Sequence, residues 1–462
     1  MIEELSGLHQ DRANLVTPGK GTSHPAGPVL YWMHRDHRVR DNWGLQYAQQ
    51  TALRHKVPLA VVHCLAPEFL QAAPVHFAFL RAGLREMEKD LDALRIPLAG
   101  LSGNPGTEVA RFANTVGASV VFTDFDPLRI KRGWMQEAAK GCTCPLVEVD
   151  SRNIVPCRKA SDKREYMART IRPKVMRGLM HYLEATPALL SHPHAWDTSL
   201  PRHAARPSVA LPEHFPAPGE AAALQALEHF IAKRLPVYEK RNDPNANAVS
   251  GLSPYLHFGM LSSQRAVLAA SGRPGQRAKS APPTEAVDEF IEQIVVRREL
   301  SDNYCLHTPH YDSLAGAPEW AVRSLDKHRD DPRDAIYTCD QFEQARTHDP
   351  LWNAAQQELL HTGRIHGYMR MYWGKKILEW STTPEGAFQT AVTLNDRHAL
   401  DGRDSNGYTG IAWCIAGQHD RPWKERPVYG QIRYMNDRGA RRKFDTTAYI
   451  ERMAELGSAG GD

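Results

Sequence analysis

Four tryptophans stand close together between Asp349 and Trp413, where they alternate with arginine, asparagine and aspartate. Trp373 and Trp380 are seven residues apart, so on a helix they share one face and lie about 10 Å apart along its axis. A buried indole can be oxidised and reduced again, and this spacing suits electron transfer from ring to ring. The simpler alternative is a stripe of aromatic core residues. The four indoles are Trp352, Trp373, Trp380 and Trp413.

Two charged residues accompany this stripe. Arg370 lies on the same predicted helix, and Asp401 lies on the loop that follows the next one. A buried guanidinium is tolerated only beside an acid or a bound anion. The pattern therefore favours a binding site with polar residues in its wall over a purely apolar core.

A second candidate site follows Tyr238, in the segment NANAVSGLSPYLHFGMLS. Its small and hydroxyl residues precede Pro254, where a helix is expected to begin. Backbone N–H groups at a helix start bind anions together with serine hydroxyls, so a phosphate-bearing cofactor is one interpretation. A simple capped helix after a turn is the other. The residues concerned are Ser250, Gly251, Leu252 and Ser253.

A loop rich in acids, amides and glycines is predicted from Asn395 to Gly407. Turn chemistry explains part of this composition. It does not explain the density of acids beside Trp413, and an amide or carboxyl group beside a flavin ring would tune the electronics of that ring. The candidate contacts in this loop are Asn395, Asp401 and Asn406.

The segment Asp420–Lys443 is basic and carries interleaved aromatic residues. Eight arginines and lysines stand against three acids, with Trp423, Tyr429 and Tyr434 among them. Basic side chains neutralise phosphates and aromatic rings stack on unstacked bases, so nucleic-acid binding is one interpretation. A solvated charged face is the other.

The bulk composition restricts the class of protein. The chain has 462 residues, a net charge of +4 and seven cysteines without a zinc or disulfide framework. These features predict an intracellular protein of two or three domains without a metal site. The N-terminus lacks a signal-peptide pattern, and no run of about 18 apolar residues predicts a membrane span. Nucleotide-binding P-loop, zinc-protease, nucleophile-elbow and dinucleotide motifs are missing, which argues against hydrolases and kinases.

Short apolar runs alternate with helical patterns over residues 28–160, which predicts a parallel sheet covered by helices. The strands are expected at 28–33, 58–65, 96–101, 118–123 and 145–149. Residues 161–220 are interpreted as a connector and residues 221–453 as an all-helical domain. Residues 1–27 and 454–462 are expected to be flexible tails.

Several motifs, in this order, resemble the photolyase/cryptochrome family, most closely the class II cyclobutane pyrimidine dimer (CPD) photolyases. They are SPYLHFGMLS, RRELSDNYC, HDPLWNAAQ, HGYMRMYWGKKILEW, LNDR, LDGRD and IRYM. The resemblance implies an α/β Rossmann-like N-terminal antenna domain and an all-α C-terminal domain that binds FAD. It implies a deoxyribodipyrimidine photolyase, a carbon-carbon lyase that repairs dimers in DNA by electron transfer from reduced FAD to the flipped-out lesion. A cryptochrome-like blue-light receptor without repair activity is the alternative within the family, and a flavin-free nucleic-acid-binding protein is the alternative outside it.

The resemblance also implies roles for individual residues. Tyr238 and residues 250–253 correspond to FAD phosphate-side contacts, Arg370 and Asp401 to an ion pair beside the isoalloxazine, and Asn395 to the amide near flavin N5. The photoreduction chain runs from flavin to surface as Trp373, Trp352 and Trp380, with Tyr337 as an auxiliary member. The lesion pocket is walled by Met371 and Trp413, and the DNA contacts are Arg421, Trp423, Lys424 and Arg433.

One departure from the family concerns the lesion clamp. Family members can place an acid and an aromatic residue one helical turn apart, where this chain has Gln293 and Arg297. Glu292 and Glu299 are nearby alternatives. The resemblance further implies UV-damaged duplex DNA as partner and a monomer. It allows an antenna chromophore, either a deazaflavin or a folate, and also an empty antenna site.

Overall fold

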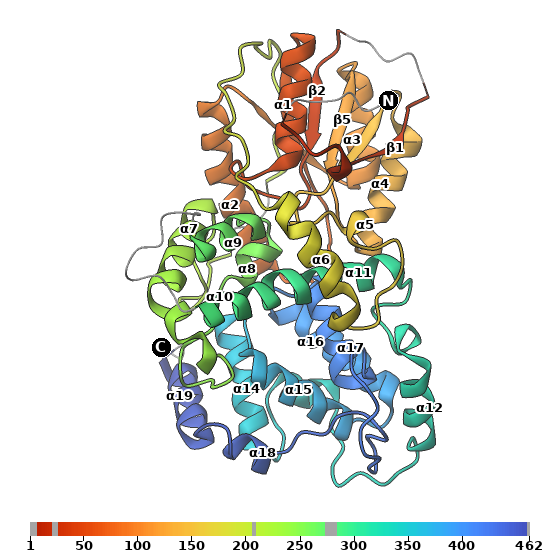
Figure 1. Ribbon diagram of the computed structural model, residues 1–462, viewed down its shortest axis with the longest axis vertical. Coiled ribbons are helices and arrows are strands. Elements are labelled where there is room, and N and C mark those ends of the chain that lie inside the picture. The colour runs from red at the N-terminus through yellow and green to blue at the C-terminus, as the bar shows by residue number, and fades with distance from the viewer. Residues whose placement is uncertain (1–6, 21–25, 206–208, 273–283, 460–462) are drawn as a thin grey trace.

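The computed structural model describes residues 7–20, 26–205, 209–272 and 284–459. An α/β domain lies at the top of Figure 1 and a larger helical domain at the bottom, and α6 and α11 lie at their junction. The predicted fold class is confirmed. Within the described residues, no helix combines the length and the apolar character that a membrane crossing requires.

The α/β domain contains a six-stranded sheet in the order β1-β6-β5-β2-β3-β4. All neighbouring strands are parallel except β1, which is antiparallel to β6. The five strands expected from the apolar runs all form, because strands buried on both faces read as continuous apolar segments. Their bounds are β2 (Val29–Trp32), β3 (Leu59–Leu65), β4 (Leu98–Ser102), β5 (Val120–Asp124) and β6 (Leu146–Val149).

Helices cover both faces of this sheet. Alternate residues of β2 point to opposite sides, so Tyr31 packs with α1 and α2 while Trp32 packs with α3 and α4. Both rings are fully buried. The helices are α1 (Trp43–His55), α2 (Pro74–Ala93), α3 (Pro105–Thr115) and α4 (Arg129–Gly141), with η1 (Gln10–Arg12) before β1.

The predicted flexible tails are partly wrong. Residues 13–17 form β1 (Ala13–Thr17), which pairs with β6 at the sheet edge. None of its five residues is fully buried, so the segment is not the continuous apolar run of a central strand. At the other end α19 (Thr446–Ala459) continues through most of the expected tail. Residues 1–6, 21–25 and 460–462 lie outside the described residues.

The predicted connector also contains regular structure. The helix α6 (Ala168–Tyr182) packs on the helical domain through Ile171, Val175 and Leu179. The irregular chain after it lies along the α/β domain, where Gln49 Nε2 donates to the Leu190 carbonyl at 2.7 Å. The short α5 (Cys157–Ala160) precedes α6.

The helical domain forms as expected from about residue 220 onward. Its core packs α14, α15, α16 and α17 together. Asp349 caps the start of α14, because its side chain accepts the backbone N–H groups of Leu351 and Trp352. The principal helices are α7 (Glu220–His229), α8 (Ser253–His257), α9 (Ser263–Ser271), α10 (Thr284–Ile291), α11 (Arg298–His307), α12 (Glu319–Lys327), α13 (Cys339–Glu343), α14 (Pro350–Thr362), α15 (Gly367–Glu379), α16 (Pro384–His398), α17 (Ser405–Ala416) and α18 (Asp437–Arg441).

Several shorter or wider turns join these helices. Two are π-helical, and a π-helix inside a longer helix often marks a functional position. The π-helices are η2 (Phe230–Arg234) and η4 (Glu292–Arg297), and the 3₁₀ turns are η3 (Leu235–Lys240) and η5 (Leu314–Gly316).

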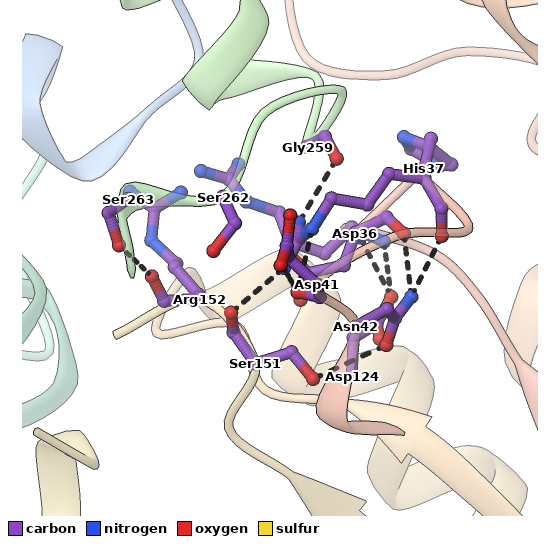
Figure 2. A network of polar contacts seen from close by, with 12 residues as sticks. Asp36, His37, Asp41, Asn42, Asp124, Ser151, Arg152, Gly259, Ser262 and Ser263 are labelled. Carbon is purple, nitrogen blue, oxygen red and sulfur yellow. Dashed lines mark hydrogen bonds and ion pairs between the residues drawn. The ribbon is translucent and has the colours of Figure 1, made fainter. Parts of the chain in front are cut away.

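A buried polar network joins the two domains. Figure 2 shows the loop after β2 meeting the loop after β6 and the turn before α9. The Arg38 guanidinium donates to the Gly259 and Ser151 carbonyls at 3.0 Å each. Ser263 Oγ donates to the Arg152 carbonyl at 3.0 Å. The helical domain is therefore held in a fixed position against the carboxyl edge of the sheet.

Candidate functional site

The three central indoles lie in direct contact. The rings of Trp352 and Trp373 stack with centroids 6.4 Å apart and planes 6° apart. Trp352 and Trp380 meet edge to face at 6.2 Å. Trp352 lies on α14, Trp373 on α15 and Trp380 at the end of α15. Such contacts provide a continuous aromatic path through the helical core.

Hydrogen bonds fix the rings of Trp373 and Trp352. The Trp373 indole N–H donates to Gln356 Oε1 at 2.8 Å, and the Trp352 indole N–H donates to the Trp373 carbonyl at 3.0 Å. Sequence reasoning missed Gln356, although its position one helical turn after Trp352 places both side chains on one face of α14. Its side chain is fully buried, so the amide orients Trp373 without access to water.

The expectation that Trp380 is the surface end of this path is wrong, because Trp380 is only 3 % exposed. Two rings lie over it, the exposed His348 at 4.9 Å and the partly buried Tyr337 at 5.8 Å. The Tyr337 hydroxyl accepts the backbone N–H of His348 at 2.9 Å and lies 2.7 Å from His348 Nδ1. The Tyr337 hydroxyl and the His348 imidazole therefore share a hydrogen bond whose direction follows the tautomer of the ring.

The predicted ion pair forms. Arg370 Nη2 lies 3.0 Å from Asp401 Oδ1 and 3.3 Å from Oδ2. Burial of Asp401 opposes its ionisation, but the Arg370 charge and hydrogen bonds, together with Ser253, hold its pKa below the usual value. Ser253 and Arg370, the expected contacts of two different parts of a cofactor, thus converge on one carboxylate.

Two guanidiniums missed by sequence reasoning converge on Gly251. Arg364 Nη1 donates to the Gly251 carbonyl at 3.4 Å, and Arg234 Nη1 to the Val249 carbonyl at 3.3 Å. A Cβ at Gly251 would stand 3.2 and 3.3 Å from these two Nη1 atoms, and its φ of +71° also favours glycine. Burial and the neighbouring Arg364 charge lower the pKa of Arg234.

Neither guanidinium has an acidic partner among the residues described. The structure shows no ion pair of Arg234 or Arg364 with an Asp or Glu in the described ranges, and the Arg234 Nε is buried without a hydrogen-bond partner there. Two like charges this close, each partly exposed, make this position favourable for an anion. They come from η2 and from the loop after α14, so only the folded chain reveals the cluster.

Tyr238 lies in an aromatic cluster beside η2. Its ring packs edge-on against Phe290 at 5.9 Å and Phe230 at 5.7 Å, with the Arg241 guanidinium 5.4 Å from its centroid. Burial raises the pKa of Tyr238 to about 12. The structure therefore gives Tyr238 a packing role beside η2, whose last residue is Arg234.

The predicted polar loop from 395 to 407 is much shorter than expected. Asn395 lies inside α16, and Asn406 and Gly407 lie in the first turn of α17. The helix α17 begins there because Asp404 Oδ1 accepts the Asn406 backbone N–H at 3.0 Å. The exposed Asn406 amide also donates to Asp404 at 3.1 Å, which makes Asn406 part of this cap.

A series of aromatic rings and cations leads outward from Trp413. The Lys375 ammonium lies 4.6 Å from the Trp413 ring centroid, and the Arg433 guanidinium 5.8 Å from it. Arg433 lies 4.9 Å and Arg421 5.4 Å from the Trp423 ring, which is 38 % exposed. The structure thus brings together four of the residues that were predicted separately in the lesion pocket and the DNA contacts.

Met371 and Lys424 flank this series. Met371 is partly buried and lies on α15 one turn before Lys375, so it shares a face with the residues that contact Trp413. Lys424 is exposed beside Trp423.

The π-helix η4 carries the departures from the family pattern. Gln293 and Arg297 are both exposed, and Arg297 Nε pairs with Glu292 Oε1 at 3.0 Å. Glu292 Oε1 also forms an ion pair with Arg172 Nη2 of α6 at 2.8 Å.

A role for Glu299 in lesion or DNA binding is contradicted. Its side chain is 2 % exposed, and Oε1 accepts the Ile154 backbone N–H at 2.8 Å. Glu299 therefore joins α11 to the loop after β6. Burial raises the pKa of Glu299 to about 8.

Comparison with known proteins agrees with this architecture. A family model described as DNA photolyase matches residues 29–192. A protein of Potorous tridactylus named Deoxyribodipyrimidine photo-lyase is 42 % identical over 97 % of this chain and 85 % of its own length. A protein of Arabidopsis thaliana with the same name is 44 % identical over 93 % of this chain and 89 % of its own. The chain belongs to the DNA photolyase family.

The photolyase fold is also found among solved structures. An archaeal photolyase from Sulfolobus tokodaii, crystallised with two FAD molecules, aligns with a TM-score of 0.69 at 17 % identity. The alignment covers 92 % of this chain and 89 % of that one. At this identity the likeness concerns the fold alone.

This photolyase chain has a cavity where its two domains meet. It encloses about 690 Å³, part of it open to solvent, at the carboxyl ends of β2 and β3. Residues from both domains line it, among them His34, His37, His76, Lys131, Trp134 and Arg403.

Several ring nitrogens in this cavity lack partners in the described part of the chain. They are both nitrogens of His34 and the Nε2 atoms of His37 and His76. Burial lowers the pKa of His37 to about 3, so its imidazole is neutral at physiological pH. Over the same residues, no cluster of three metal-type side chains is found.

Proposed function

We propose that this protein repairs cyclobutane pyrimidine dimers in DNA by light-driven electron transfer, as a deoxyribodipyrimidine photolyase. The observation that carries the proposal is the contiguous indole path of Trp373, Trp352 and Trp380 in the core of the helical domain. Its relatives over nearly the whole chain are named Deoxyribodipyrimidine photo-lyase, which supports the same activity here.

We propose that the helical domain holds FAD, and the donor set fits that group. Arg234 and Arg364 have no acidic partners in the described ranges and would clamp the pyrophosphate, with Gly251 letting the backbone approach closely. Ser250, Leu252 and Ser253 at the start of α8 complete this phosphate side. When bound and reduced, FAD supplies the photoexcited electron that splits the dimer.

On the ring side, the Arg370–Asp401 pair would stabilise negative charge on the reduced cofactor and fix its orientation. Asn395 would contact N5. Since Asn406 caps α17, its contribution to binding would be indirect, through the position of that helix. Tyr238 would act through its packing against η2, which carries Arg234.

The indole chain would relay electrons inward to keep the cofactor reduced. Gln356 fixes Trp373, and the stacked pair gives the shortest step. At the outer end, Tyr337 and His348 extend the path beyond the buried Trp380. With His348 Nδ1 as the acceptor, the hydrogen bond between the Tyr337 hydroxyl and this ring would let the proton move to the imidazole when Tyr337 loses an electron.

The DNA face would surround Trp413. Flipping a dimer out of the duplex costs less free energy than flipping intact bases, because the dimer pairs poorly. This difference is one source of selectivity. Met371 and Trp413 would wall the pocket for the flipped dimer. The remaining DNA contacts would be Arg421, Trp423, Lys424 and Arg433 around the gap in the duplex, and Gln293 and Arg297 at the pocket rim.

We further propose that the cavity between the domains holds an antenna chromophore. Of a deazaflavin and a folate, a planar deazaflavin fits better, because neutral imidazoles can donate to ring carbonyls while Lys131 and Arg403 favour an anionic ring. Reconstitution with each chromophore class tests this assignment by absorption spectroscopy. Lys131→Met should weaken binding, whereas Lys140→Met, exposed on the same helix, should not.

We propose that the protein acts as a monomer on duplex DNA inside the cell. The decisive assay uses an oligonucleotide with a single dimer and enzyme reduced with dithionite. Loss of the dimer under blue light and its persistence in the dark are expected. Flavin binding and lesion binding without repair would instead support a blue-light receptor, and a colourless protein would support the flavin-free alternative.

A further inference from the structure

The Asn395 side chain is held in one orientation by its neighbour Asp396. Asn395 Nδ2 lies 3.1 Å from Asp396 Oδ1. A carboxylate accepts hydrogen bonds and does not donate them, so the atom facing Asp396 is the amide nitrogen and not the amide oxygen. Both residues are buried, which excludes water as a substitute partner.

Asp396 is itself held as an acceptor. Oδ1 also receives the Arg403 backbone N–H at 2.8 Å, and Oδ2 receives the Tyr408 hydroxyl at 2.7 Å. Burial raises the pKa of Asp396, while the Arg403 charge and these hydrogen bonds oppose that rise. Because the Arg403 backbone N–H can only donate, Oδ1 is an acceptor, and the Asn395 atom that faces it is the amide nitrogen.

Gly407 on α17 leaves room for this arrangement. A Cβ at residue 407 would stand 2.9 Å from Asn395 Nδ2, closer than real Cβ contacts allow, and 3.9 Å from Oδ1. The nitrogen side of the amide is therefore enclosed by Asp396 and Gly407. The oxygen side has no hydrogen-bond partner within the described chain, and it is the side left for a ligand.

We propose that Asp396 is a positioning residue that turns the Asn395 amide so that its oxygen, rather than its nitrogen, faces the flavin N5. The inference rests on the proposed function, which places Asn395 beside N5. It assigns a task to a carboxylate that does not itself touch the cofactor.

The orientation selects a redox state. The N5 of a reduced flavin carries a hydrogen and donates, whereas the N5 of an oxidised flavin only accepts. An amide oxygen at this position therefore binds the reduced form more tightly, and an amide nitrogen would bind the oxidised form. One hydrogen bond shifts the ratio of the two forms about tenfold, which corresponds to about 30 mV for a two-electron couple.

The test compares flavin midpoint potentials of four proteins. Asp396→Leu removes the acceptor, frees the amide and should lower the potential by about 30 mV relative to wild type. Asp396→Asn should stay close to wild type, because its Oδ1 can still accept from Asn395 and Arg403 while its amide donates to the Tyr408 oxygen. Gly407→Ala should displace the Asn395 amide from the other side and lower the potential as Asp396→Leu does.

Gly407→Ala also guards against misfolding as an explanation. Alanine favours a helix over glycine by about 1 kcal/mol, which offsets part of the cost of displacing the buried amide, and a urea unfolding curve checks that the variant is folded. Binding of dimer-containing DNA in the dark should be unchanged in all three variants, because Asp396 and Gly407 contact the Asn395 amide and are not among the proposed DNA contacts. A potential unchanged in both Asp396→Leu and Gly407→Ala, or lowered equally in Asp396→Asn, would overturn the inference. Wild-type protein that binds no flavin would instead overturn the proposed function.

Discussion

At the scale of single residues, Trp373 forms one end of the three-indole series and is held by Gln356. Trp373→Phe should stop photoreduction of oxidised flavin under blue light with an external reductant. Dimer repair by chemically reduced enzyme should persist, because that electron does not travel along the indoles. Flavin absorbance and dimer loss measure the two processes separately.

The matched control is Trp196→Phe, since Trp196 lies in the irregular chain after α6 and donates to Thr198. That variant should keep both activities. Equal loss of photoreduction and repair in Trp373→Phe would remove this residue from the electron path.

The unpaired guanidiniums give a second prediction at this scale. Arg364→Ala should weaken FAD binding by about tenfold to a hundredfold, the range for one charge-assisted hydrogen bond. The stability of the flavin-free protein should not fall, because the substitution relieves repulsion with Arg234. Fluorescence titration of the apoprotein with FAD measures the affinity, and Arg177→Ala, exposed on α6, serves as control. Unchanged affinity would place the phosphates elsewhere.

At the scale of elements, Asp349 positions α14 and so the Trp352 ring. Its carboxylate accepts the N–H groups of Leu351 and Trp352 and the hydroxyl of Tyr372. Asp349→Ala should reduce the free energy of unfolding by about 1–2 kcal/mol, the usual cost of a lost N-cap. Urea unfolding measures it, with Asp437→Ala as control because Asp437 is half-exposed and its pair with Arg441 contributes little. No loss in Asp349→Ala would mean that tertiary packing alone holds the helix.

Most elements could be predicted from the sequence because their signals are local. Strands β2, β3 and β5 are apolar runs, and α14 and α15 carry helical spacing. The edge strand β1 was missed because half of its residues face solvent. The helix α17 was partly read as a loop because Asn406 and Gly407 resemble a turn, although Asp404 is a sound N-cap signal.

The residues of the candidate site were likewise predictable only where their signal is local in the sequence. The Arg370–Asp401 pair was predictable because a charged residue on an apolar stripe needs a partner. Arg234 and Arg364 were not, since only the folded chain brings them to Gly251. Glu299 was assigned wrongly because the nearby Gln293 and Arg297 are exposed, whereas its own side chain is buried against the Ile154 backbone.

At the scale of the whole molecule, Glu299 ties the two domains together, and burial raises its pKa to about 8. A carboxyl group whose folded pKa lies above its unfolded value binds extra protons in the native state. Its contribution to stability therefore falls as pH rises from about 4 to about 8.

Glu299→Gln should remove this slope, since glutamine can still accept the Ile154 N–H. The stability gain over wild type should be small near pH 5, about 1 kcal/mol, and should reach about 4 kcal/mol near pH 8.5. Unfolding by urea at both pH values measures the difference, with the exposed Glu285→Gln as control. Equal stability of the variant and wild type at both pH values would contradict the buried, protonated state.

The short loop of residues 399–404 belongs to both halves of the molecule. Arg403 lines the cavity between the domains and also donates to the Ala399 and Leu400 carbonyls, where the helix that carries Asn395 ends. Asp404 in turn pairs with Arg35 and Arg152 of the α/β domain. The N-terminal half therefore cannot be exchanged independently of this loop. A chimera that grafts this half from a distant relative should assemble only if residues 399–404 are transplanted with it, so the two halves are expected to be inherited together.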